Sequence, residues 1–268
     1  MKLRPALSAL VAALLACGAL AQTGADPAAA VRQELARCGV SAQDTPALAL
    51  SARDVLRGQE LGRALTGQGY RARDAHGWQL TFGDLAGLRR AVQESCAPWR
   101  GLGEYGLSVS GHRLSLIAAV PARVDLTQSR RWLADLLAAT NRARFQGQKC
   151  GDKLMNAAPP LKWDPRLEAA AARQATDLVR LDFRGHVNPQ DGSGPLERAA
   201  AYGFRGGVGE NLSYGPVTAQ EAVQSLLGSP GHCENLMNPA WTLFGGAVNN
   251  GTATTLFPTY WVQVFGAP

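Results

Sequence analysis

The stretch GENLSYGPVTAQEAVQSLLGSPGHCENLMNP (residues 209–239) carries the start and stop signals from which the fold can be worked out. Thr218 and Glu221 are spaced as a capping box, which predicts a helix that continues to Leu227. Ser229 followed by Pro230 predicts the start of a second, short helix that runs to residue 237. The glycines at 203–209 predict a loop before the stretch.

Strands and further helices surround this stretch. Residues 244–248 and 260–265 are apolar runs typical of strands in a sheet covered on both faces. Upstream, Asp164 before Pro165 predicts the start of a helix that ends at Leu181. An earlier helix, which opens the second half of the chain, carries an apolar stripe at Trp132, Leu133, Leu136 and Leu137, with Asn141 and Arg144 near its end. Helices flanking a mainly antiparallel sheet predict an α-β-α sandwich over residues 128–268.

The first half of the chain predicts a separate small α+β domain over residues 22–127. We expect a helix ending at Cys38, a helix over 51–65, a strand over 78–82 and a helix capped by Asp84. Two strands, 105–110 and 113–120, would form a hairpin. The boundary falls at Pro121 and residues 125–127. The fold class is therefore α+β, with a sandwich preceded by this smaller domain.

Composition excludes several classes of protein. The chain has 268 residues, of which 46% are hydrophobic and 18% charged, too apolar for a disordered protein. Beyond the N-terminus no apolar run approaches the roughly 18 residues that a transmembrane helix needs. The net charge is +6, but the arginines are scattered and not interleaved with aromatic residues. We therefore expect no nucleic-acid partner and no transmembrane segment.

The N-terminus predicts export. Lys2 and Arg4 precede an apolar run, and Ala19-Leu20-Ala21 fits the cleavage pattern of a secretory signal peptide over residues 1–21. The alternative is lipoprotein processing at Cys17, whose preceding residues match the lipoprotein pattern imperfectly. We expect a secreted protein, or one held in the periplasm or cell envelope.

Four cysteines remain if Cys17 leaves with the signal peptide, and an even number is typical of an oxidising compartment. Three pairings are conceivable. The spacing contains no C-x-x-C motif, which argues against a zinc knuckle or a thioredoxin-type site. We favour one bridge in each half, Cys38–Cys96 and Cys150–Cys233, each worth about 2–5 kcal/mol. The alternative is that some of these cysteines are free and buried.

Three distant polar residues are candidates for a shared site. His186, Glu210 and His232 each lie beside turn-forming residues, where side chains can converge in a cleft. Two imidazoles and one carboxylate could hold zinc or another divalent cation with one position open to water. Alternatively, the same side chains only hydrogen-bond loop backbone. Asn211 is a further cleft candidate, although it more often satisfies main-chain groups in a turn.

A set of ordered motifs over roughly residues 128–268 resembles the bacterial branch of the CAP superfamily. This family comprises cysteine-rich secretory proteins, antigen 5 and pathogenesis-related 1 proteins, and its domain is also called the SCP domain. The resemblance implies the α-β-α sandwich and an extracellular role, and it does not cover residues 22–127. The motifs are Asn141-x-x-Arg144, Leu161-x-Trp163, His186, Arg198 with Tyr202-Gly203-Phe204, Gly209-Glu210-Asn211-Leu212, Ser229-Pro230-Gly231-His232, Asn238-Pro239 and Tyr260-Trp261-Val262-Gln263-x-Phe265-Gly266.

The resemblance carries His186, Glu210 and His232 over as members of a His/Glu/Glu/His cavity tetrad. The second glutamate is missing here, because the helix at 219–227 offers only Glu221 at its start, and this weakens a divalent-ion site. Ser229 is expected to cap a helix rather than act as a nucleophile. We expect an extracellular or envelope binding module for a small ligand, lipid, peptide or envelope component. The alternatives are a metal-assisted hydrolase using the same cleft and an adhesive or structural envelope protein.

Overall fold

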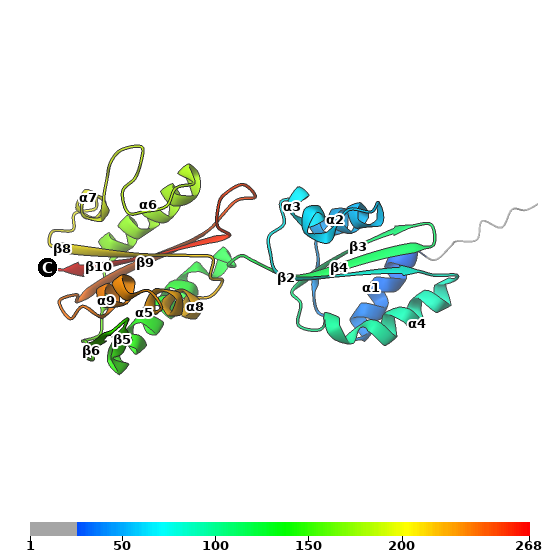
Figure 1. The fold of residues 1–268 in the computed structure, drawn as a ribbon, viewed down its shortest axis with the longest axis horizontal. Coiled ribbons are helices and arrows are strands. Elements are labelled where there is room, and N and C mark those ends of the chain that lie inside the picture. The colour runs from blue at the N-terminus through cyan, green and yellow to red at the C-terminus, as the bar shows by residue number, and fades with distance from the viewer. Residues whose placement is uncertain (1–25) are drawn as a thin grey trace, which may run out of the picture.

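The computed structural model describes residues 26–268, so the predicted signal peptide and Cys17 lie outside the described residues. Two four-stranded sheets, each with helices on both faces, lie side by side along the long axis of the molecule (Figure 1). We call residues 26–127 the N-terminal part and residues 128–268 the C-terminal part. No helix among the described residues has the length and apolarity needed to cross a membrane.

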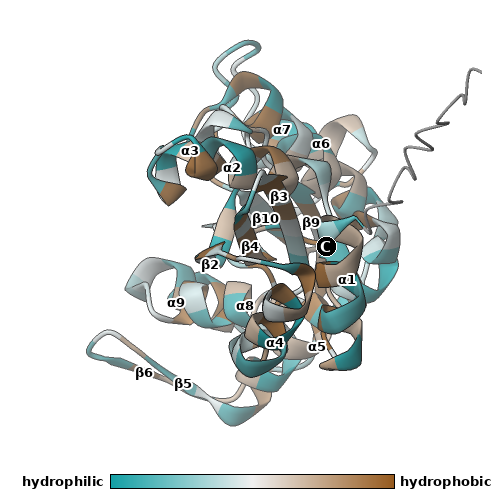
Figure 2. Ribbon diagram, turned by 90° about the vertical axis from the view of Figure 1, so that its right-hand side faces the viewer, coloured by the Kyte–Doolittle hydropathy of each residue, from teal (hydrophilic) through white to brown (hydrophobic). Residues whose placement is uncertain are grey.

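The N-terminal part is built on a sheet with strand order β1-β3-β4-β2. Two hydrophobic clusters, one on each face, hold the helices to the sheet, and apolar residues concentrate on the strands between them (Figure 2). The strands are β1 (Gln43–Asp44), β2 (Ala72–Thr81), β3 (Glu104–Ser110) and β4 (Arg113–Pro121); the helices are α1 (Pro27–Arg37) and α4 (Leu85–Ser95) on one face, and α2 (Pro46–Leu56) and α3 (Leu61–Gly67) on the other.

Two details of the predicted N-terminal part were wrong. The single helix expected over 51–65 is two helices, because Gly58 takes a φ of +96° and Glu60 starts α3 by accepting from the N–H groups of Gly62 and Arg63. The strand expected over 78–82 begins earlier, at Ala72, because β2 pairs with β4 over almost its whole length.

The C-terminal part is the predicted α-β-α sandwich, with strand order β7-β9-β10-β8. Alternate residues of β10 explain the layers: Trp261 and Phe265 pack in one hydrophobic cluster, and Tyr260 and Val262 in the other. A short hairpin, β5 (Gln148–Cys150) and β6 (Lys153–Met155), projects from the body (Figure 2). The strands are β7 (Lys162–Trp163), β8 (Gly207–Tyr214), β9 (Leu243–Asn250) and β10 (Thr259–Ala267); α6 (Pro165–Leu181) and α7 (Pro195–Ala201) cover one face, and α5 (Ser129–Gln146), α8 (Ala219–Leu227) and α9 (Pro230–Met237) the other.

The strand β8 is a correction to the sequence prediction. The loop expected over 203–209 ends earlier, because β8 begins at Gly207 and pairs with β10 along its whole length. Gly209 lies in this strand for a steric reason: a Cβ atom there would come within 2.8 Å of the Trp241 ring. Glu210 is consequently a strand residue and not a turn residue, which fixes the direction of its side chain.

Both favoured disulfides are confirmed. Cys38–Cys96 joins the residue after α1 to the residue after α4, and Cys150–Cys233 joins β5 to α9. Each bridge lies within one part of the chain. The division at residues 127 and 128 into independently folding domains stays a prediction.

Candidate functional site

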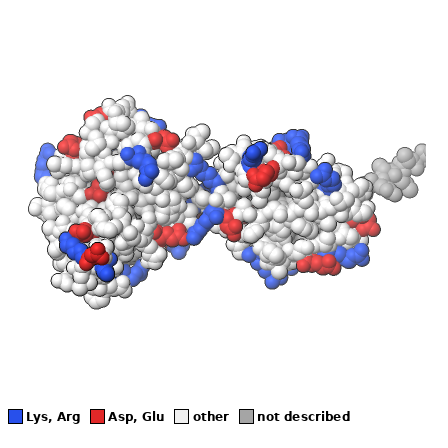
Figure 3. Space-filling model, viewed as in Figure 1, with Lys and Arg blue, Asp and Glu red and all other residues white. Residues whose placement is uncertain are grey.

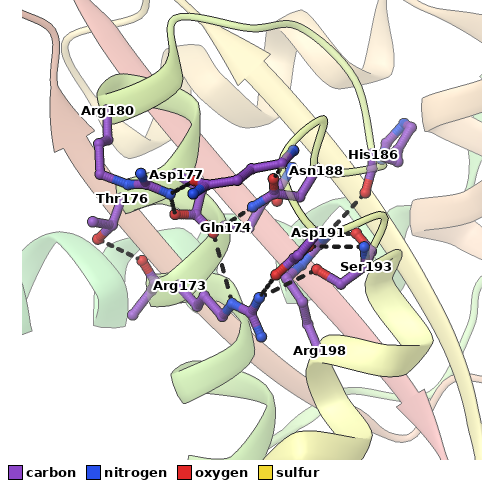
Figure 4. Close-up of polar contacts among 12 residues, drawn as sticks. Arg173, Gln174, Thr176, Asp177, Arg180, His186, Asn188, Asp191, Ser193 and Arg198 are labelled. Atoms are coloured by element: carbon purple, nitrogen blue, oxygen red, sulfur yellow. Dashed lines mark hydrogen bonds and ion pairs between the residues drawn. The ribbon is translucent and has the colours of Figure 1, made fainter.

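The loop that carries His186 is held against α6 and α7 by a network of polar and charged side chains (Figure 4). Asn188 donates to Asp177 of α6 at 2.8 Å, and the Nη1 of Arg198 donates to the main-chain oxygens of His186 and Ser193 at 3.0 and 2.8 Å. Gln174 also donates to the oxygen of Gly185 at 2.9 Å. A loop tied at so many points presents its side chains from a fixed position.

Glu210 is held by two partners at once. Its Oε2 accepts from Arg198 Nη2 at 2.7 Å, and its Oε1 lies 2.9 Å from His186 Nδ1. The Arg198 and Glu210 side chains are 0% and 1% exposed, whereas that of His186 is 45% exposed. Because the carboxylate can only accept, His186 Nδ1 carries the proton, which leaves Nε2 as the ring nitrogen for another partner.

His232 lies on the first turn of α9 and borders the same cavity as His186. Burial, and secondarily the proximity of His186, lowers the pKa of His232 below its ordinary value of 6.5. The neutral imidazole is therefore its main form at neutral pH. Asn211 plays a supporting part, because its Nδ2 donates to the main-chain oxygen of His232 at 3.0 Å and its own side chain is buried.

A cavity of about 710 Å³ lies between the His186 loop, β8 and the helices α8 and α9. Glu210 and Asn211 do not line it; they support it from β8. One wall is aromatic: the Tyr214 and Phe257 rings stack at 4.8 Å, and the Arg184 guanidinium lies 5.2 Å from the Phe257 ring centre. The lining residues are Arg184, Gly185, His186, Leu212, Ser213, Tyr214, Ser225, Leu226, Ser229, His232 and Phe257.

The three predicted metal ligands do not fit a metal ion in this arrangement. Both oxygens of Glu210 are already used, one by a buried arginine whose positive charge opposes a cation. Among residues 26–268 no group of three or more His, Cys, Asp or Glu side chains is placed to hold a metal. The three-ligand site therefore stays a prediction, and this geometry gives it no support.

Several residues of the cavity were not singled out from the sequence. Arg184, Tyr214 and Phe257 come from a loop, from the end of β8 and from the segment before β10, so no local spacing connects them. The sequence did offer a signal for Arg184, because it stands two residues before the predicted site residue His186. Ser229 was expected to cap a helix; it occupies the N-cap position of α9, but its side chain makes no capping hydrogen bond.

Residues 137–265 match the model of the cysteine-rich secretory protein family, abbreviated CAP. A curated relative, the uncharacterized protein YkwD of Bacillus subtilis (strain 168), is 32% identical over 98 residues. That alignment covers 36% of this chain and 38% of YkwD, so the chain spans less than half of this relative.

Solved structures with some similarity come from other bacteria. An extracellular protein containing an SCP domain from Bacillus anthracis str. Ames is 18% identical, with a TM-score of 0.42, over 61% of this chain and 56% of that one. An outer surface protein from Borrelia burgdorferi is 22% identical, with a TM-score of 0.43, over 54% of this chain and 96% of that one.

Proposed function

Because its residues 137–265 belong to the cysteine-rich secretory protein family, we propose that the chain is an exported binding module. Its cavity beside His186 and His232 would receive a ligand that carries an anionic group. Export is supported by the two disulfides, since such bonds persist in oxidising compartments. The predicted signal peptide is consistent with the same location.

The charge of the cavity lining carries the proposal about the ligand. Among the lining residues that the structure describes, Arg184 is the one that is charged at every physiological pH, and none is a carboxylate. Glu210 cannot offset this charge, because it pairs with Arg198 beneath the lining. The hydroxyls of Ser225 and Ser229 add groups that can donate to an anion. A site with this chemistry favours a negatively charged group near Arg184.

The geometry gives less support to a hydrolase. Within the described residues no hydrogen bond joins a serine hydroxyl to His186 or His232, and the metal-ligand set does not assemble. A nucleophile would need such a base within hydrogen-bond reach. Binding without chemistry is the function that the side chains favour.

A histidine-detected titration tests the proposal. The chain has four histidines: His186 and His232 border the cavity, whereas His76 and His112 lie in the N-terminal part and serve as internal controls. With ¹³C-histidine-labelled protein, N-acetylglutamate should move the signals of the first pair and leave the second pair unchanged. N-acetylglutaminamide, in which amides replace both carboxylates and which carries no charge, should bind roughly 10-fold more weakly, because the contact with Arg184 is charge-assisted.

Two variants sharpen the test. Arg184→Gln should weaken N-acetylglutamate binding by roughly 10-fold, while Arg205→Gln, an exposed arginine that does not line the cavity, should not. If neither cavity histidine responds, or if the acid and the amide bind equally well, the proposed anion-binding function is wrong.

A further inference from the structure

The strand beside the cavity is an edge of its sheet. Among the strands of residues 26–268, β8 pairs with β10 alone, so every second residue of β8 turns its main-chain groups away from the sheet. The Gly215 N–H donates to the oxygen of Thr259 at 3.0 Å, which sets the alternation. The main-chain groups of Ser213 therefore face β10, and those of Leu212 and Tyr214 face outward.

The outward-facing groups are covered at one end of β8 and free at the other. The oxygen of Glu210, the preceding outward residue, accepts from Asn235 Nδ2 of α9 at 3.1 Å. Among residues 26–268, no side chain or loop hydrogen-bonds to the main chain of Leu212 or Tyr214. The open part of the edge thus begins just after Glu210 and continues to the end of the strand.

This open edge borders the cavity. Leu212 is a lining residue although its side chain packs into the hydrophobic cluster on the α6 side, so the part of it left to face the cavity is its main chain. Ser213 is 2% exposed, and its Oγ has no hydrogen-bond partner among the described residues. A buried hydroxyl without a partner is costly, and a ligand in the cavity could supply one.

We propose that the cavity takes an extended peptide, which adds to β8 as a further strand and places an acidic side chain beside Arg184. The inference rests on the proposed function and names its ligand class. Free N–H and C=O groups on Leu212 and Tyr214 would pair with the peptide main chain, as in other cases of strand addition. At about 3.3 Å per residue, roughly five residues would cover this edge and both walls.

The charge and the walls favour a peptide over a second copy of this chain. The His186 loop and α8 enclose the edge as a cavity rather than a flat surface, and a flat surface is what two whole sheets would need for pairing. Arg184 is the only lining group of the described residues that is charged at every physiological pH, so a single acidic residue satisfies it. The Tyr214 and Phe257 rings offer apolar contact to the neighbouring peptide side chains.

Amide hydrogen exchange in ¹⁵N-labelled full-length protein tests the inference. The probe is a pool of blocked pentapeptides with glutamate at the centre and the other four positions randomised. Exchange at Leu212 and Tyr214 should slow at least about 10-fold with the pool, because their N–H groups become bonded. Exchange at Ser213, already bonded to β10, should not change. The matched control is the same pool with every amide N-methylated, which should give no protection.

The outcomes separate this inference from the proposed function. If N-acetylglutamate moves the cavity histidines but the pool protects neither Leu212 nor Tyr214, the peptide inference is wrong and the anion site stands. Equal protection by the N-methylated pool would also overturn it, since the pairing would then not involve the peptide main chain. Protection that appears without peptide and grows with protein concentration would mean that two copies pair through β8, which likewise overturns it. If neither probe acts, both proposals fail.

Discussion

At the residue scale, Arg198 and Glu210 form an ion pair that solvent does not reach. Arg198→Met would leave the Glu210 carboxylate buried without its cation, and removing one partner of a buried pair costs about 3–5 kcal/mol. The same change also frees the oxygens of His186 and Ser193. We expect the midpoint of urea unfolding, followed by amide signals of residues 128–268 in the full-length protein, to fall accordingly.

A double variant separates charge from packing. Arg198→Met combined with Glu210→Gln removes both charges, so it should regain part of the lost free energy of unfolding. Arg205→Met, at an exposed position, should change the midpoint little. A loss below about 1 kcal/mol in the single variant would show that water or another cation reaches Glu210.

The sequence predicted which kind of partner a polar residue would bond better than it predicted which residue that partner would be. Asn211 was expected to satisfy a main-chain group, and it does donate to the main-chain oxygen of His232. Arg198, located only as part of a motif, pairs with a carboxylate and with main-chain oxygens. Residue type limits what a buried polar group can do, which explains this success. Glu210 bonds Arg198 and His186, so its oxygens are not left for a metal ion. This arrangement depends on distances between segments that are far apart in the sequence, and no local sequence pattern contains those distances.

At the element scale, α1 and α4 are joined by one buried carboxylate. Glu34 of α1 is fully buried and bonds Gln93 and Arg89 of α4 as well as Arg37. These bonds, that of Gln93 first, lower the pKa of Glu34 below its ordinary value of 4.5. The folded state therefore holds the ionised form more strongly than the unfolded state does.

This linkage predicts the acid sensitivity of the N-terminal part. The stabilisation from Glu34 is fully present above pH 4.5 and is lost as the pH falls through the lowered folded pKa. Glu34→Gln should be less stable than the wild type at pH 7 and should lose less stability on acidification. Amide signals of residues 26–127 followed through urea titrations at several pH values provide the measurement. Parallel pH profiles for the two proteins would contradict the assignment.

Elements with local signals were the ones that could be predicted. Asp164, Asp84 and Thr218 each accept a main-chain N–H at the start of the expected helix, because a cap involves only residues within one turn. β8 was not predicted as a strand, since its glycines resemble a loop and its pairing with β10 is long-range. The open edge of β8 follows from strand order, which the sequence does not specify.

In the whole molecule, a loop of the C-terminal part reaches the N-terminal part and also borders the cavity. The loop 251–258, between β9 and β10, accepts from Arg71 Nη2 through the oxygens of Ala253 and Thr255. The same loop carries Phe257, which lines the cavity. A second link joins Arg73 to Glu221 of α8 at 2.8 Å, where charges of both signs meet at the junction (Figure 3).

These links predict that the N-terminal and C-terminal parts are only loosely joined. The Arg73 and Glu221 side chains are 52% and 33% exposed, and exposed ion pairs contribute about 0–1 kcal/mol. Arg71→Ala with Arg73→Ala should therefore leave the unfolding free energy of each part nearly unchanged. It should, however, let the parts tumble separately, so that ¹⁵N relaxation gives them different correlation times. Arg100→Ala with Arg142→Ala, exposed arginines within single parts, is the control. Because the 251–258 loop, which carries Phe257, would lose its bonds from Arg71, the double variant should also bind N-acetylglutamate more weakly. A single shared correlation time would show that other contacts hold the parts together.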